Sequence, residues 1–431
     1  MNIKETIRDI VVFILALEAR AVLKRYRPKI IVVTGSVGKT SSKDAIYSTL
    51  SQHAFVRKSE KSFNADIGVP LTVLGVPNGW TNPIQWMQNI IDGFLLLIIR
   101  MPYPQWLVLE VGADRPGDIS KSLSWLKPDI VVTTRFPEMP VHVEFYTSPE
   151  AVFEEEIFPL TQLTEGGVAV INSDDERSRV YPLKEGIRRI SYGFSKDADI
   201  RATRYRVRTS QGTAAGISFS VHYKEETLPI SVDGIIGETH VYAILAGIAG
   251  AMAAGAPFSV LESVKEAYNP PPGRLRLIDG SYGGLIIDDT YNASPTATEK
   301  ALHTLQSVPT EGKRIAVLSD MLELGSYSKE EHKKIGILAH DLSDMLVVVG
   351  VRARHIAEGA AQAGMPDSCI HMFEKRSEAI AFLRKELSSG DTVLIKGSQS
   401  MRMEHVTKKL MKNPAMAEEL LARQDPEWLI R

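Results

Sequence analysis

Cysteine, long apolar runs and clustered basic charge are scarce in this sequence of 431 residues. Its one cysteine, Cys369, excludes an intramolecular disulfide framework and a cysteine metal cluster, and is typical of a reducing compartment, so we expect a cytoplasmic protein. The formal net charge is -2, and no long run of Lys or Arg interrupts it. This balance argues against nucleic acid as a partner. We expect a monomer.

Two apolar runs, at residues 10–17 and 90–99, are each too short to span a bilayer. The first lacks a small-residue cleavage site, so it does not indicate a secretory signal. We interpret both as packing helices. The alternative is a pair of helices resting on a membrane surface, because Lys24, Arg25 and Arg27 follow the first run.

The length predicts two or three domains, and 44% hydrophobic and 24% charged residues indicate a globular protein. Residues 29–53 read as strand, glycine turn and helix, which is the first unit of a parallel α/β sheet. Buried strands are predicted at residues 106–113, 129–135 and 166–172. Alternating residues from 198 to 232 indicate an antiparallel portion, and an alanine-rich helix follows it.

The stretch "AYNPPPGRLRL" (267–277) is the clearest boundary, because three prolines and a glycine cannot continue a helix. Beyond it the alternation of strands and helices starts again. The sequence therefore predicts an α/β protein with three parts. These are an apolar N-terminal helix (1–28), a central phosphate-loop domain with a mostly parallel sheet (29–269), and a C-terminal Rossmann-like domain (270–431).

The stretch "TGSVGKTSS" (34–42) departs from the usual phosphate loop G-x-x-x-x-G-K-[ST]. Val33 stands where the first glycine belongs, and Gly35 lies three residues before Gly38. These glycines still let backbone N–H groups surround an anion at a helix N-terminus. Lys39 can reach the β/γ-phosphates and Thr40 can bind Mg²⁺, so we predict a nucleoside triphosphate site. The alternative is a glycine turn with an exposed lysine.

Glu110 lies near the carboxyl end of one predicted strand of the central domain, and His142 follows the next predicted strand. Ligands of open parallel sheets bind beyond those strand ends, so Glu110 is placed to hold Mg²⁺ together with Thr40. Its alternative role is a cap or an ion pair. His142 is either a metal or phosphate ligand or a structural histidine.

In the C-terminal part, "DDTYNASP" places two carboxylates, a tyrosine and an asparagine after a strand. The carboxylates could orient ribose hydroxyls or a cation, and Tyr291 offers a flat face to a base. Capping chemistry is the alternative. Arg274, on the hinge, could clamp a phosphate only when the two domains close.

Taken together, the sequence resembles the Mur ligase family of ATP-dependent amide-bond-forming enzymes of peptidoglycan synthesis. The resemblance rests on stretches in the family's order between residues 30 and 405: "TGSVGKTSSKD", "NADIGVPLT", "LEVGADRPGDI", "HVEFYTS", "GGVAVINSDD", "PPGRL", "DDTYNASP", "VLSDMLELG" and "LIKGSQSMRME". The loop spacing is the form that this family uses. "DDTYNASP" and "DMLELG" favour the branch that adds D-Ala-D-Ala to a peptidoglycan precursor peptide.

The resemblance implies an enzyme in which ATP converts a substrate carboxylate to an acyl phosphate, which an amine then attacks. It implies these roles: for ATP, Gly35, Ser36, Val37, Gly38, Lys39, Thr40, Ser41, Arg274, Asp288, Tyr291 and Asn292; for catalysis, Lys39, Glu110 and His142; for Mg²⁺, Thr40, Glu110 and His142; for the acceptor carboxylate, Asn64, Asp66 and Thr72; and for the amine donor, Ser398.

Three departures from the family's pattern stand out. Family members commonly carry a carbamylated lysine after the histidine segment, but "SPEAVFEEEIF" has none, and Glu154, Glu155 or Glu156 stands near that place. We expect Glu156 to be the metal ligand. The family's G-x-H-N reads "GETH", with Thr239 and His240 in the last two places, so contacts of that asparagine are in doubt.

The third departure is at the front. Members of this branch begin with a domain for the UDP-sugar end of the substrate, and thirty residues are too few to form it. The acceptor therefore stays open between a UDP-linked peptide and a lipid-linked precursor. The enzyme alternative is the same chemistry on a polyamino acid or glutamyl chain. The non-enzyme alternative is a nucleotide-binding protein that has lost ligation.

Overall fold

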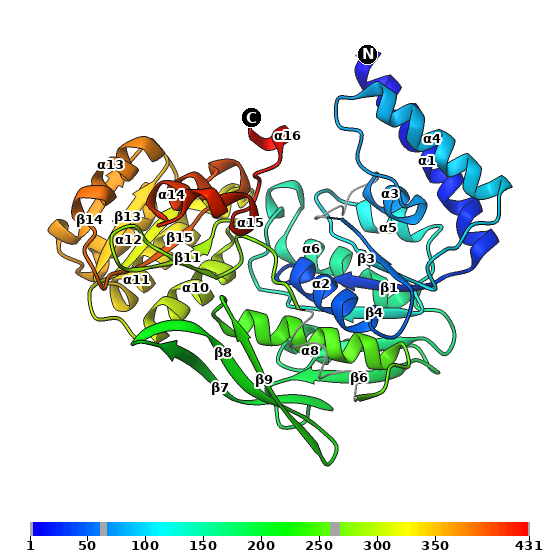
Figure 1. The fold of residues 1–431 in the computed structure, drawn as a ribbon, viewed down its shortest axis with the longest axis horizontal. Helices are drawn as coiled ribbons and strands as arrows, with labels where there is room; N and C mark the ends of the chain where they lie inside the picture. Colours follow the sequence, from blue (N-terminus) through cyan, green and yellow to red (C-terminus); the bar gives the residue numbers. More distant parts are fainter. Residues whose placement is uncertain (1–2, 61–66, 259–267, 430–431) are drawn as a thin grey trace.

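The chain folds around two β-sheets joined by the proline-rich segment at residues 270–275 (Figure 1). The computed structural model describes residues 3–60, 67–258 and 268–429. The first sheet has nine strands in the order β2-β3-β1-β4-β5-β6-β7-β8-β9. Its strands are β1 (Lys29–Thr34), β2 (Val56–Lys58), β3 (Trp106–Glu110), β4 (Ile130–Thr133), β5 (Val168–Asn172), β6 (Arg188–Gly193), β7 (Ile200–Ser210), β8 (Thr213–Tyr223) and β9 (Glu226–Asp233).

Neighbouring strands pair in parallel from β2 to β7, and β7, β8 and β9 pair antiparallel. The central strands carry apolar side chains on both faces because helices cover both. Ile31 and Val33 pack with α2 and α8, whereas Ile30 and Val32 face the other layer. The helices are α1 (Ile3–Tyr26), α2 (Lys39–Leu50), α3 (Gly68–Leu74), α4 (Pro83–Ile98), α5 (Asp118–Leu123), α6 (Pro149–Ile157), α7 (Glu176–Arg179) and α8 (Glu238–Ala253).

The second sheet has six strands in the order β10-β11-β15-β12-β13-β14, parallel except for the edge strand β10. Its strands are β10 (Arg276–Asp279), β11 (Leu285–Asp289), β12 (Arg314–Ser319), β13 (Met345–Val349), β14 (Ile370–Phe373) and β15 (Thr392–Lys396). The helices beside it are α10 (Pro295–Ser307), α11 (Ser328–Leu342), α12 (Arg354–Ala363), α13 (Arg376–Glu386), α14 (Glu404–Leu410), α15 (Ala417–Leu420) and α16 (Pro426–Leu429).

These sheets confirm the predicted fold class, a phosphate-loop α/β part with a mostly parallel sheet and a Rossmann-like α/β part. We call them the first and second lobes. The predicted boundary at 269/270 falls between α8 and β10, and we keep the three-part division as a proposal. Strands β2, β6, β10 and β14 were not predicted, since they are short or only partly buried.

Helices α1 and α4 lie side by side at the outer end of the first lobe (Figure 1). Tyr26, the last residue of α1, donates hydrogen bonds from its hydroxyl to the carbonyls of Leu96 (3.0 Å) and Ile99 (3.2 Å) at the end of α4. The two helices therefore run in the same direction. In the part of the chain that the structure describes, no helix combines the length and apolar character needed to cross a membrane.

Candidate active site

A cavity of about 710 Å³ opens between the lobes, at the carboxyl ends of strands from both sheets. We call it the loop cavity. It is lined by residues of the turn after β1, by Glu110 at the end of β3, and by residues of the second lobe that include Asn292 and Ser398. Strand ends of open parallel sheets are where such proteins bind ligands. The two sheets thus place sequence-distant polar groups around one space.

The turn after β1 has the backbone that its glycines allow. Gly35 and Gly38 have φ values of 118° and 93°, a region that other residues rarely adopt. A Cβ at Gly35 would lie 2.3 Å from Oγ1 of Thr134, so only glycine fits there. Helix α2 begins at Lys39, and the Nζ of Lys39 donates to the carbonyl of Gly35. The loop thus presents a helix N-terminus and a lysine to the cavity.

Glu110 and Thr40 meet at the bottom of the loop cavity. The Thr40 hydroxyl donates to Oε1 of Glu110 at 3.1 Å, and both side chains are buried. Oε2 of Glu110 has no hydrogen-bond partner among the described residues, and its nearest positive charge is Nζ of Lys43 at 3.8 Å. A buried carboxylate oxygen without a donor beside a hydroxyl suits Mg²⁺, which binds oxygen ligands.

The three glutamates of α6 have three different environments. Glu154 is exposed. Glu155 accepts hydrogen bonds from the backbone N–H groups of Gly117 (3.1 Å) and Ile119 (2.9 Å), so it caps α5. Glu156 is buried against the loop, where its side chain accepts from the Ser36 hydroxyl and lies 3.8 Å from Nζ of Lys39. Burial raises the pKa of Glu156, and Lys39 opposes that rise. The structure therefore brings only Glu156 of the three to the loop.

His142 lies on the wall of the loop cavity, in the left-handed region with φ 67°. Its Nε2 is 3.6 Å from Oδ1 of Asp114 in the first lobe, and its Nδ1 is 2.7 Å from Oε2 of Glu323 in the second lobe. The close contact with His142 lowers the pKa of Glu323. His142 thus bridges the lobes, a role that its sequence position did not suggest.

The second lobe contributes Arg274, Tyr291, Asn292 and Ser398. The Arg274 guanidinium carbon lies 4.1 Å from the centroid of the Tyr291 ring, and its Nε has no hydrogen-bond partner among the described residues. Asn292 accepts from the backbone N–H of Gln399 at 3.3 Å. The Ser398 hydroxyl accepts from the backbone N–H of Leu322 at 2.9 Å. All four line the loop cavity, as expected of a site completed by both lobes.

The two adjacent aspartates of β11 have opposite orientations. Asp288 is fully buried and accepts hydrogen bonds from the hydroxyls of Thr407 (2.7 Å) and Thr290 (2.9 Å). Burial raises its pKa to about 7. Asp289 faces the interlobe space, where Lys396 donates to it at 2.6 Å. Because side chains alternate along a strand, the structure brings Asp289, and not Asp288, to the space between the lobes.

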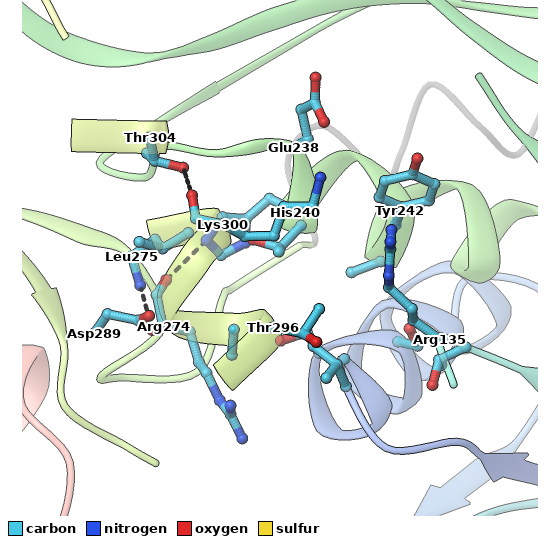
Figure 2. A pocket seen from close by; sticks show the side chains of 18 of the residues that line it. Arg135, Glu238, His240, Tyr242, Arg274, Leu275, Asp289, Thr296, Lys300 and Thr304 are labelled. Carbon is cyan, nitrogen blue, oxygen red and sulfur yellow. Dashed lines mark hydrogen bonds between the residues drawn. The ribbon is translucent and has the colours of Figure 1, made fainter. Parts of the chain in front are cut away.

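A second cavity, of about 420 Å³, lies beside the first and shares Val37, Gly38, Arg274 and Ala297 with it. We call it the hinge cavity; Figure 2 shows Asp289, Lys300 and Glu238 around it. Ser41 also lines it.

His240 holds the hinge beside this cavity. Its Nε2 lies 2.8 Å from the carbonyl of Arg274 (Figure 2). Its Nδ1 lies 3.0 Å from the Tyr268 hydroxyl. Burial lowers the pKa of His240 to about 4. The ring is therefore neutral, with Nε2–H donating to the carbonyl and Nδ1 accepting from tyrosine. The histidine that replaces the family's asparagine fixes the backbone of the hinge arginine.

Of the three expected acceptor residues, the structure describes only Thr72. Thr72 is buried in α3, and its hydroxyl donates to the Gly68 carbonyl at 2.9 Å. It lines neither the loop cavity nor the hinge cavity. Asn64 and Asp66 lie outside the described residues.

Asp114, Glu323 and Lys396 contribute to the site but were not predicted. Each lies in a stretch that carries the family resemblance, so the motif was recognised but the role of the residue was not.

Among the described residues, no group of three or more His, Cys, Asp and Glu side chains is arranged to hold a metal ion. A magnesium ion held by Thr40, Glu110 and nucleotide phosphates does not need such a group.

Two family models match the chain: the Mur ligase middle domain at residues 92–251, and the Mur ligase glutamate ligase domain at residues 273–399. A UDP-N-acetylmuramoyl-tripeptide–D-alanyl-D-alanine ligase of Bacillus subtilis is 30% identical over 406 residues, which cover 92% of this chain and 79% of the relative. The Escherichia coli protein of the same name is 27% identical over 391 residues, covering 89% and 77%.

Solved structures share the fold. MurF from Acinetobacter baumannii matches with a TM-score of 0.75 and 24% identity, covering 93% of this chain and 80% of that one. MurF from Thermotoga maritima in complex with ADP matches with a TM-score of 0.74 and 24% identity, covering 92% and 83%. The middle and C-terminal domain models and the 30% identity along most of both sequences show that this chain belongs to the Mur ligase family of ATP-dependent ligases.

Proposed function

We propose that this chain joins D-alanyl-D-alanine to the carboxylate of a peptidoglycan precursor peptide, with ATP as the energy source. The observation that carries the proposal is the arrangement of Lys39, Thr40 and Glu110 opposite Asn292 and Ser398 across one cavity. The relatives named above support the substrates, because their names specify this dipeptide and a UDP-linked tripeptide.

The two cavities suit the two ends of ATP. The loop cavity offers backbone N–H groups and Lys39 for the phosphates, and Gly35, Ser36, Val37 and Gly38 shape that turn. The hinge cavity offers Asp289 to ribose hydroxyls. Arg274 lies where both cavities meet and can bind a phosphate once its stacking partner Tyr291 positions it.

The residues of the site fit Mg²⁺ through Thr40 and Glu110, because Glu110 keeps a buried oxygen without a donor. We propose that His142 and Glu156 lie nearest to any second ion, since His142 lines the cavity and Glu156 lies 3.8 Å from Nζ of Lys39. When bound, Mg²⁺ withdraws charge from phosphate oxygens and so eases phosphoryl transfer. Glu156 carries a carboxyl group without carbamylation, and Lys39 favours its ionised form, so it can take the place of a carbamylated lysine.

In the proposed reaction the acceptor carboxylate attacks the γ-phosphorus, and an acyl phosphate and ADP form. The amine of the donor then adds to the acyl carbon, and the tetrahedral adduct releases phosphate and leaves an amide. Lys39 stabilises the charge of the transferring phosphoryl group. Contact between the lobes through His142 and Glu323 closes the cavity and keeps water from the acyl phosphate.

The test is amine-dependent release of ADP with a panel of acceptors. We expect turnover with D-Ala-D-Ala and either the UDP-linked tripeptide or its lipid-linked form, and each acceptor is assayed separately. Turnover only with glutamyl or polyamino-acid acceptors would reassign the substrate. ATP binding without acceptor-dependent turnover would contradict the ligase assignment.

We also propose that the enzyme works as a monomer in the cytoplasm, where ATP is available.

A further inference from the structure

Helices α1 and α4 carry a dense group of exposed apolar side chains. Of the nineteen exposed large hydrophobic residues among the described ones, eleven lie within residues 10–17 and 84–101. On α4 they recur along one side of the helix, at Ile84, Met87, Ile91, Phe94 and Ile98. These spacings of three and four residues place them on one stripe about 21 Å long. On α1, Ile10, Phe13 and Leu17 form a shorter stripe.

These stripes are not the faces that bind the helices to the lobe. Among the described residues, the buried ones on α1 are Leu15, Glu18, Ala19 and Val22, and those on α4 are Asn89, Gly93 and Leu96. A Cβ at Gly93 would lie 2.3 Å from Oε2 of Glu18, so the helices approach closely there. Figure 1 shows the pair extending from the first lobe on the side away from the second sheet. The pair is therefore packed firmly, with its apolar stripes facing outward.

Positive charge gathers at one end of the pair. Lys24, Arg25 and Arg27 at the end of α1 and Arg100 after α4 are all exposed, and the parallel arrangement brings them together. The acidic residues of the two helices do not gather at that end. Asp9 is exposed near the start of α1, Glu18 is buried between the two helices, and Asp92 accepts a hydrogen bond from Gln88 at 2.8 Å.

We propose that α1 and α4 dock this protein peripherally on an anionic phospholipid surface, with the apolar stripes in the acyl boundary and the basic end at the headgroups. Exposed apolar stripes together with clustered Lys and Arg are the features of helices that lie in the interfacial plane. Each basic residue near an anionic surface adds to the attraction, and salt screens it. We assign a lipid surface as the partner of this face for two reasons. The stripes consist of aliphatic, Phe and Met side chains, and the Lys and Arg side chains at their end complement lipid phosphates. This docking goes beyond the ligase reaction and does not depend on it.

The test is flotation of the full chain with vesicles of phosphatidylcholine alone or with 30 mol% phosphatidylglycerol (about one third anionic lipid). We expect binding to the anionic vesicles, at least tenfold weaker binding to neutral ones, and a further loss at high salt. The double variant Ile91→Asp/Phe94→Asp should bind at least tenfold less. Lys24→Glu/Arg25→Glu should lose the preference for anionic lipid.

The matched control is Val351→Asp/Met372→Asp, which changes two equally exposed apolar side chains of the second lobe. It should bind vesicles like the parent protein. All variants should keep the parent's thermal unfolding temperature, because the changed side chains are exposed. Absence of vesicle binding, or equal binding by the α4 variant, would overturn the proposal. A dimer that the α4 variant abolishes, without vesicle binding, would also overturn it and make this face an interface between copies.

Discussion

Nδ1 of His142 and Oε2 of Glu323 lie 2.7 Å apart, and this contact joins the first lobe to the second across the loop cavity. His142 also lies 3.6 Å from Asp114, so its ring is oriented from both sides. A histidine that is held by a carboxylate presents its other ring nitrogen in a fixed direction. The closed arrangement of the lobes and the orientation of His142 are therefore coupled.

Glu323→Gln should weaken this coupling with little change in volume. We expect ligase turnover to fall about 10- to 100-fold and the Mg²⁺ concentration for half-maximal activity to rise. Small-angle X-ray scattering should show a larger radius of gyration. Glu330→Gln, an exposed glutamate on α11, is the control. If turnover, Mg²⁺ requirement and size all match the parent protein, the contact has no part in closure.

Replacing each of the three glutamates of α6 with glutamine should have a different effect on activity and stability. Glu156→Gln should reduce turnover about 100-fold or more, because it removes the anion beside Lys39. Glu154→Gln should leave activity and stability unchanged. Glu155→Gln should lower the free energy of unfolding by about 1 kcal/mol, because Glu155 caps α5. Steady-state kinetics and chemical unfolding of the three variants check this. Equal activity of the Glu156 and Glu154 variants would remove Glu156 from the site.

Replacing only one partner of the Lys396–Asp289 ion pair should lower the stability of the fold. Both side chains are buried, Nζ of Lys396 lies 2.6 Å from Asp289, and burial lowers the pKa of Lys396. Lys396→Met leaves a buried carboxylate unpaired, so we expect a loss of about 3–5 kcal/mol in the stability of the second lobe. Lys396→Met/Asp289→Asn should recover part of that loss in urea unfolding. A double variant less stable than the single one would contradict the pairing argument.

The neutral His240 predicts a dependence of stability on pH. Its pKa is about 4 in the folded protein and 6.5 ordinarily, so the unfolded chain binds its proton more readily. The contribution of His240 is full above pH 6.5 and is lost as the pH falls toward 4. Its full size is about 3 kcal/mol.

To isolate this contribution, the unfolding temperature of His240→Gln is subtracted from that of the parent protein at each pH from 4 to 8. The difference should shrink as the pH falls. His303→Gln changes an exposed histidine of α10 and should give a difference independent of pH. A constant difference for His240→Gln would show that this ring does not resist protonation.

The sequence predicted the first-lobe half of the site because that half follows from sheet topology. β1 and β3 are parallel neighbours with Val33 opposite Glu110, so their following residues must meet. The glycine positions and the Lys-Thr pair fixed the turn and the start of α2. The turn and the start of the helix need no long-range information.

The other residues of the site could not be predicted, because their roles depend on the direction in which a side chain points or on contacts between the lobes. Which of Asp288 and Asp289 faces the interlobe space depends on the side of β11 that its helices cover, and both residues are chemically alike. The choice among Glu154, Glu155 and Glu156 depends on the rotation of α6. The contact of His142 with Glu323 joins segments from different sheets, so local patterns cannot predict it.

The position of Glu156 beside the phosphate loop affects which form of the nucleotide can bind, the magnesium complex or the metal-free form. In this structure Lys39 already contacts the Gly35 carbonyl and lies near the Glu156 carboxylate, so its charge is partly compensated. A metal-free triphosphate would meet a second anion next to that lysine and would be repelled. We therefore expect the site to admit nucleotide as its magnesium complex and to reject the free tetra-anion. The Glu156 carboxylate therefore disfavours the binding of ATP without Mg²⁺, a form that cannot react.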